Sequence, residues 1–302
     1  MVKRMLKLKE ILVPLDGSVE AESVLPYLRD LAPKFGSHVR ILGVGIGRKT
    51  RRVNRLLEDY IKRIANNLHT DNIKTEAVIC YGIAADKILD FTVAKEIDLI
   101  IMATHGRSGI TRWWMGSVAE KVISEATAPV LLVRSKRPSK TGDAEKLHFL
   151  QKILAPLDGS DIGEAALPYA ETLAINSGAS VNLLQVVSPP GTVEAGLLGG
   201  PDWRRFVKAM QDAGENYLIS IAEKLNGAGI KSICEVVTGD PADKIVEYAG
   251  NKKVTLIAMS THGRTGLARW VLGSVADKVL HDARVPILLV RSPKMIIPKP
   301  RG

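Results

Sequence analysis

Short apolar runs alternate along the first half of the chain with longer segments in which apolar residues recur every three or four positions. The runs at 10–15, 38–46, 73–80, 98–103 and 129–134 have the length and the Val, Ile and Leu content of strands. The segments between them have helical spacing, at Val24, Leu25, Leu28, Leu31 and Ala32, at Leu56, Leu57, Tyr60, Ile61, Ile64 and Leu68, and at Ala84, Ile88, Leu89 and Val93. The pattern predicts five strands alternating with helices.

The predicted strands are apolar at almost every position. Strands without polar alternation are covered on both faces, and strands that alternate with helices form parallel sheets with right-handed crossovers. We therefore expect an α/β fold with a five-stranded parallel sheet and helices on both faces. Ser18 is expected to cap the first helix, and Pro26 and Pro168 are expected to kink that helix and its counterpart.

The second half of the chain repeats the first. The segment "KEILVPLDGS" at 9–18 returns as "QKILAPLDGS" at 151–160, an offset of 142 residues, whereas "THGRSG" at 104–109 returns as "THGRTG" at 261–266, an offset of 157. The second copy therefore has 15 extra residues (157 − 142) between these matches, which include part of 188–203. A repeat of this length indicates whole domains rather than a solenoid. We predict a first domain at 1–136, a linker at 137–149, a second domain at 150–293 and a basic tail at 294–302.

Composition narrows the class of protein. The 302 residues are 46% hydrophobic and 25% charged, which is typical of a globular protein. The apolar runs are far shorter than the roughly 20 residues that cross a bilayer, and no signal-peptide pattern stands at the start, so we expect a cytoplasmic protein. Cys80 and Cys234 have no metal-ligand spacing, and we expect them to be buried, inert thiols rather than a disulfide or a zinc site.

The net charge of +10 favours anionic partners, but the excess is local. It lies mainly at 48–55, at 134–140 and in the tail. No aromatic residues alternate with these cations, so a solvated basic surface is as good an interpretation as a nucleic-acid patch. Nucleic-acid binding ranks last among the functions considered.

Ligands of open parallel sheets bind beyond the carboxyl ends of the strands. Asp16 and Asp158 follow the first strand of each copy, and a Thr-His-Gly loop follows the fourth. The glycines of that loop, Gly106 and Gly263, let backbone N–H groups approach a ligand closely. This edge of each sheet is therefore the candidate site.

Each loop leads to a Gly-Ser pair at a helix start. Ser117 with Glu120, and Ser274 with Asp277, have the spacing of a capping box. Free N–H groups at a helix start, together with the positive end of its dipole, can bind an anion such as phosphate. The chain has no GxxxxGK[ST] motif, so efficient phosphoryl transfer lacks most of its usual parts.

These motifs resemble those of universal stress protein domains. Nucleotide-binding members of that family carry Gly, two residues, Gly, nine residues, and Gly-Ser or Gly-Thr. The chain has nine residues between Gly106 and Gly116-Ser117, and nine between Gly263 and Gly273-Ser274. Ala103 and Ser260 stand where the family has its first Gly.

The resemblance implies two tandem Rossmann-like domains, similar to adenine nucleotide alpha hydrolases, that bind ATP or AMP, with Mg²⁺ as an optional companion of the nucleotide. It implies a stress-response sensor or regulator without efficient turnover, and no catalytic residue or metal ligand. The strand-one Asp would lie near the adenosine, and Val44 and Val186 would line the base. The implied contact residues are Pro14, Leu15, Asp16, Val44, Met102, Ala103, His105, Gly106, Gly116, Ser117 and Val118 in the first copy, and Pro156, Leu157, Asp158, Val186, Met259, Ser260, His262, Gly263, Gly273, Ser274 and Val275 in the second.

Two alternatives stay open. One is a slow ATP-hydrolysing enzyme, and the other is an interaction module whose pockets Ala103 and Ser260 have closed. His105 and His262 have no recognisable nucleophile partner, which favours a loop or phosphate contact over a general base. The resemblance also implies that the segments 129–134 and 286–291 pair within one chain, and it leaves a homodimer open.

Overall fold

The computed structural model describes residues 6–45, 47, 51–104, 115–134, 148–188, 201–263 and 272–292. These residues form two compact units. The first contains the described residues up to Phe149 together with 286–291, and the second contains most of the described residues between Leu150 and Val285. Because 135–147 lie outside the described residues, the predicted linker and domain limits stay a prediction. Among the described residues, none of the helices combines the length and the hydrophobicity that a membrane-spanning helix requires.

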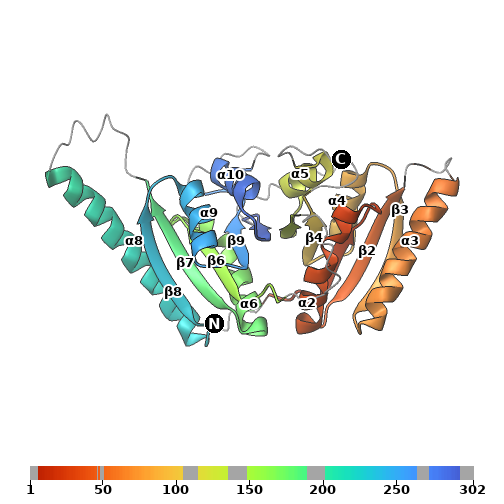
Figure 1. Cartoon of the computed structure of the whole chain (residues 1–302), viewed down its shortest axis with the longest axis horizontal. Helices are drawn as coiled ribbons and strands as arrows, with labels where there is room; N and C mark the ends of the chain where they lie inside the picture. The colour runs from red at the N-terminus through yellow and green to blue at the C-terminus, as the bar shows by residue number, and fades with distance from the viewer. Residues whose placement is uncertain are drawn as a thin grey trace. The chain divides into compact units, whose positions relative to one another are not determined.

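The first unit follows the predicted alternation of strands and helices (Figure 1). Its elements are β1 (Glu10–Pro14), α1 (Val19–Glu22), α2 (Leu25–Phe35), β2 (His38–Gly45), α3 (Arg51–Thr70), β3 (Lys74–Tyr81), α4 (Ala84–Ala94), β4 (Leu99–Ala103), α5 (Ser117–Glu125) and β5 (Val130–Val133). The strands are parallel in the order β3-β2-β1-β4-β5. The order reverses between β1 and β4, which places the candidate site at their carboxyl ends.

The first unit gains a sixth strand from far along the chain. Strand β10 (Ile287–Val290) pairs antiparallel with β5, and Leu288 lies opposite Leu131. This confirms the predicted pairing of the segments 129–134 and 286–291. It also covers an edge of β5 that would otherwise expose unpaired backbone groups.

The second unit repeats the same order of elements. They are β6 (Lys152–Leu157), the 3₁₀ helix η1 (Gly163–Ala166), α6 (Leu167–Ser177), β7 (Ser180–Val187), α8 (Pro201–Gly227), β8 (Ser232–Thr238), α9 (Pro241–Asn251), β9 (Leu256–Ser260) and α10 (Ser274–Asp282). The strand order within the unit is β9-β6-β7-β8, again parallel. The predicted α/β class with two Rossmann-like domains is confirmed.

Burial follows the apolar pattern of the strands. Ile11, Leu12 and Val13 are all fully buried, so β1 is covered on both faces as predicted. Two apolar positions of the helical spacing lie at the surface, since Leu56 is 65% exposed and Val93 67%. The buried stripe of α3 contains Ile61, Ile64, Ala65 and Leu68, and Leu56 projects from another side of the helix.

The expected proline kinks are also wrong. The first helix stops at Glu22, and Pro26 lies in the first turn of the separate helix α2. Pro168 takes the same place at the start of α6. A proline in the first helical turn interrupts no intrahelical hydrogen bond, because the N–H that it lacks would have no partner there. The Ser18 cap is confirmed, with its Oγ accepting from Ala21 N–H at 3.1 Å.

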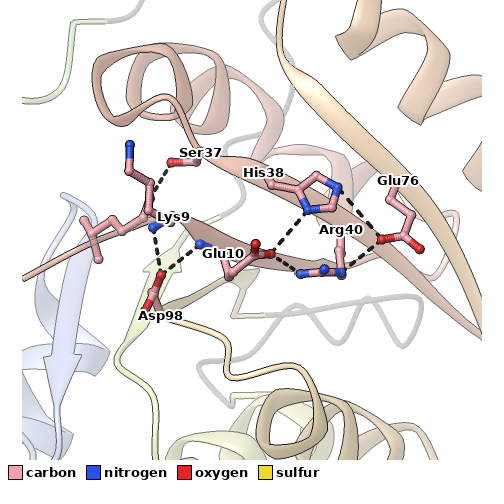
Figure 2. Close-up of polar contacts among 8 residues, drawn as sticks. Lys9, Glu10, Ser37, His38, Arg40, Glu76 and Asp98 are labelled. Carbon is pink, nitrogen blue, oxygen red and sulfur yellow. Dashed lines mark hydrogen bonds and ion pairs between the residues drawn. The ribbon is translucent and has the colours of Figure 1, made fainter.

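A polar network holds the opposite ends of the strands in the first unit, away from the candidate site (Figure 2). Arg40 on β2 bonds to Glu10 on β1, and its Nε donates to Glu76 on β3 at 3.0 Å. Asp98 accepts from the backbone N–H groups of Lys9 (2.7 Å) and Glu10 (2.9 Å), which ties the start of β1 to the start of β4. The network therefore ties the amino-terminal parts of these strands together, at the edge of the sheet opposite the candidate site.

The two cysteines form no disulfide, as expected. Both are free, but each is half-buried rather than buried, so the expectation of full burial is wrong. Burial, with a contribution from the Glu215 carboxylate, raises the pKa of the Cys234 thiol. The thiol form is therefore favoured, which suits an inert side chain.

Candidate functional site

The strand-one carboxylate of each unit is held by a serine two residues on. Asp16 Oδ1 accepts from the N–H (2.9 Å) and the Oγ (2.5 Å) of Ser18. Asp158 Oδ1 accepts from the same groups of Ser160, at 3.0 and 2.7 Å. Because the N–H and the hydroxyl of one serine both donate to the same carboxylate oxygen, each carboxylate has a fixed orientation at the end of its strand. The Asp-Gly-Ser triplet, identical in both copies, was the sequence signal for this role of the serine.

Ser160 in turn anchors the start of the following helix. Its Oγ accepts from Gly163 N–H at 3.0 Å, as Ser18 Oγ accepts from Ala21 N–H. A β-carbon on Gly163 would collide with Asp158 Oδ1, so η1 lies directly against the carboxylate. The aspartate, the serine and the first helical turn therefore form one connected group.

The loop after β9 brings the second predicted segment to the same place. A β-carbon on Gly263 would lie 2.5 Å from Asp158 Oδ2. The backbone of the Thr-His-Gly loop therefore touches the strand-one carboxylate, which is the juxtaposition that the sequence predicted. The corresponding residues of the first unit, His105 and Gly106, lie outside the described residues.

Contacts among Ser260, Thr261 and His262 hold the conformation of this loop. Ser260, at the end of β9, is buried, and its Oγ lies 3.4 Å from His262 N–H as an acceptor. Thr261 Oγ1 lies 3.0 Å from His262 Nδ1. Ala103 stands at the place of Ser260 in the first unit and has no hydroxyl for such a bond. Among the predicted contact residues, this pair distinguishes the two units most clearly.

The helices α5 and α10 begin in the same way. Gly116 N–H donates to the Thr104 carbonyl and Gly273 N–H to the Thr261 carbonyl, each at 2.9 Å. A β-carbon on Gly273 would lie 3.1 Å from the Thr261 oxygen and 3.5 Å from His262 Cα. The helix start therefore lies close against the loop, and glycine provides the space.

The expected capping boxes are wrong. Gly116 and Gly273 are the N-caps, no side chain of the described residues caps either helix, and Ser117 and Ser274 are the first helical residues. The first intrahelical bond of α5 runs from Glu120 N–H to the Gly116 carbonyl at 3.0 Å, so the N–H groups of residues 117–119 precede it. We call these groups, with those of residues 274–276 on α10, the amide cradles. With the helix dipole behind them, such groups can bind an anion.

The other predicted contact residues lie around the same strand ends. Pro14 ends β1 opposite Leu42, and Leu15, the next residue, donates its N–H to the Leu42 carbonyl. The half-buried Val44 lies two residues further along β2. Pro156, Leu157 and the half-buried Val186 have corresponding places in the second unit. Met102 and Met259 are each only 5% exposed. Ligand contact at all these residues, and at Val118 and Val275, stays a prediction.

The described ranges contain no group of three or more His, Cys, Asp or Glu side chains that could hold a metal ion. The site that they outline has a fixed carboxylate at one side of the Thr-His-Gly loop and backbone N–H groups at the other. A carboxylate accepts hydrogen bonds from hydroxyl or amino groups, whereas backbone N–H groups donate to an anion. The arrangement suits a ligand with a neutral, donor-rich end and an anionic end.

Comparison with known proteins follows the duplication of the chain. The Universal stress protein family matches residues 7–134 and, a second time, residues 150–291. Universal stress protein MJ0531 of Methanocaldococcus jannaschii is 37% identical over 147 residues, which cover 49% of this chain and 85% of that protein. Universal stress protein Rv2005c of Mycobacterium tuberculosis is 29% identical over 204 residues, and the match spans 66% of this chain and 63% of that protein.

The whole-chain fold also has solved counterparts. A universal stress protein from Archaeoglobus fulgidus superposes with a TM-score of 0.69 at 19% identity, over 93% of this chain and 98% of that one. At this level of identity the likeness concerns the fold alone.

Proposed function

Because the chain belongs to the Universal stress protein family, we propose that its two units bind adenine nucleotide, ATP or AMP, as a sensor or regulator without efficient turnover. The proposal is supported above all by the repeated arrangement at α5 and α10, where the N-cap is a glycine and no side chain within the described ranges caps the amide cradle. Phosphate is the anion that suits such a helix start. Mg²⁺ would accompany the nucleotide rather than bind the protein by itself.

The orientation of the nucleotide follows from charge. Asp158 would repel phosphate oxygens, so the phosphates belong at the amide cradle and the nucleoside at the carboxylate. Ribose hydroxyls and the adenine amino group are donors that a carboxylate can accept from. Asp16 has the same place in the first unit, held by Ser18. Val44 and Val186, near the ends of β2 and β7, would line the base.

Equilibrium calorimetry with ATP tests the proposal. We expect two binding events per chain in the wild type, one in Gly116→Asp or Gly273→Asp, and none in the double variant. Aspartate is a favourable N-cap that takes up helix N–H groups, so each substitution adds negative charge to a cradle and fills it. Circular dichroism would check that each variant remains folded. Equal binding by all four proteins would contradict the proposal.

A further inference from the structure

A tyrosine on the long helix of each unit reaches toward the segment that follows the strand-one aspartate. In the second unit, Tyr217 on α8 donates its hydroxyl to Glu164 Oε1 on η1 at 2.9 Å. Glu164 is one residue beyond Gly163, which lies against Asp158 Oδ1 and donates to Ser160 Oγ. The hydrogen bond therefore ties η1 to α8 one residue beyond the glycine that contacts the carboxylate.

A short, continuous series of contacts connects the two ends. Gly163 is part of η1, so it moves whenever η1 moves. Because Gly163 already lies against Asp158 Oδ1, the carboxylate has no room to move toward η1. Asp158 Oδ2 lies against Gly263 on the other side. The carboxylate is thus enclosed between η1 and the loop after β9, and α8 determines one side of that enclosure through Tyr217.

The same two residue types stand at the corresponding places of the first unit, although the buried Tyr60 hydroxyl has no hydrogen-bond partner among the described residues there. Tyr60 corresponds to Tyr217 (217 − 157 = 60), and Glu22 to Glu164 (164 − 142 = 22). Burial, with the nearby carboxylates of Glu22 and Asp16, raises the pKa of Tyr60, so its hydroxyl keeps its proton. Along the aligned parts of α3 and α8 most residues differ between the copies, and besides this tyrosine only one other polar position, Glu58 and Glu215, is identical.

Resting on the proposed function, we infer that Tyr217, acting through Glu164, is a positioning residue that holds Asp158 where it recognises the nucleoside end of the ligand. Tyr217 does not need to touch the ligand itself. Its loss should weaken the binding of ligands that carry a nucleoside and leave the binding of a bare polyphosphate unchanged, because only the nucleoside uses the carboxylate. A purely structural bond would not separate the two kinds of ligand.

The experiment uses the full chain with Gly116→Asp as background, so that binding reports the second unit. We expect Tyr217→Phe and Glu164→Ala each to raise the dissociation constants of ATP and AMP by roughly five- to tenfold, somewhat less than the direct loss of a hydrogen bond to a charged group. The dissociation constant of inorganic tripolyphosphate should stay within about twofold of its value for the background protein, because tripolyphosphate contacts only the amide cradle. The double variant should be no weaker than either single variant, because both remove one interaction.

Two further variants complete the design. Glu164→Gln keeps an acceptor for the tyrosine hydroxyl, so it should retain ATP binding. Tyr248→Phe removes another buried hydroxyl of the second unit, which accepts from Nδ2 of Asn182, the β7 residue opposite Leu154, at 3.1 Å; it should leave the binding of both ligands unaffected. Unchanged ATP affinity in Tyr217→Phe, or an equal loss of tripolyphosphate binding, overturns the inference. If the background protein itself binds no ATP, the proposed function fails, and this inference fails with it.

Discussion

At the scale of single residues, position 163 marks a chemical difference between the two sites. The corresponding residue of the first unit is Ala21 (163 − 142 = 21), and it lies in an α-helical turn rather than a 3₁₀ turn. In the second unit a methyl group at this position would meet Asp158 Oδ1, which Ser160 holds in place. Two motifs that are alike in sequence therefore enclose their carboxylates differently.

Gly163→Ala is expected to lower the stability of the second unit by about 1–3 kcal/mol, the usual cost of adding a methyl group where no space exists. The added carbon should also displace the Asp158 carboxylate and weaken ATP binding at this unit. Urea unfolding and calorimetry would measure the two effects. The matched control is Ala21→Gly in the first unit, with an expected loss of about 1–2 kcal/mol from helix propensity and from the lost burial of the methyl group, and with ATP binding unchanged. Equal, small effects of the two substitutions would contradict the prediction.

At the scale of elements, the long helix packs on a neighbouring strand in both units, α3 on β2 and α8 on β7. The glycine that makes room for this contact lies on the strand in the first unit and on the helix in the second. Gly43 on β2 makes room for α3, since a β-carbon there would lie 2.8 Å from Ile61 Cγ1 and 3.2 Å from Leu57 Cγ. In the second unit the strand carries Gln185 (43 + 142) and the helix carries Gly214 (57 + 157). A β-carbon on Gly214 would lie 2.8 Å from Gln185 Oε1. The large side chain has moved from helix to strand.

This exchange predicts a compensating pair of substitutions. Gly214→Leu alone should destabilise the chain by about 1–3 kcal/mol through overpacking against Gln185, even though leucine is the better helix former. Adding Gln185→Gly recreates the arrangement of the first unit and should recover most of that loss. Urea unfolding of the two single variants and the double variant gives the coupling free energy. Simple additivity of the two single effects would show that the residues do not share this space.

At the scale of the whole molecule, a strand from the end of the chain completes the sheet of the first unit. Leu288 on β10 is 3% exposed and lies opposite Leu131 on β5. Without β10, the β5 edge would offer its backbone groups to another chain. The stability of the first unit thus depends on residues about 150 positions after its own last strand.

Leu288→Pro should lower the midpoint of unfolding and promote association of chains, because a proline inside a short strand disrupts its pairing and opens the β5 edge. Light scattering after size-exclusion chromatography would detect the association, and urea unfolding the loss of stability. Leu288→Ile keeps the backbone N–H and the side-chain volume, so a change below about 1.5 kcal/mol is expected. A monodisperse, fully stable proline variant would show that β5 does not need this partner.

The sequence by itself determined the alternation of strands and helices, the duplication and the place of the candidate site. Apolar periodicity and turn residues act over a few positions, so β1, β2, β3, β4 and β5 begin and end within about a residue of the predicted bounds. The Asp-Gly-Ser triplet and the Thr-His-Gly loop could be assigned to one edge because parallel strands all end there. That edge is a property of chain order and hydrophobic pattern, which the sequence contains in full.

Only the tertiary structure decided which atoms meet at that edge. Contacts such as Asp158 with Gly263 and Tyr217 with Glu164 join residues far apart in the chain, and no local pattern specifies their distance. The first residue of each helix is determined by the loop that packs against it. Whether Gly116, Gly273, Pro26 and Pro168 act as N-caps or as first-turn residues therefore could not be decided from local sequence. Sequence spacing suggested Ser117 and Ser274 as caps, but the bonds of Gly116 and Gly273 to the preceding loop placed the helix starts one residue earlier.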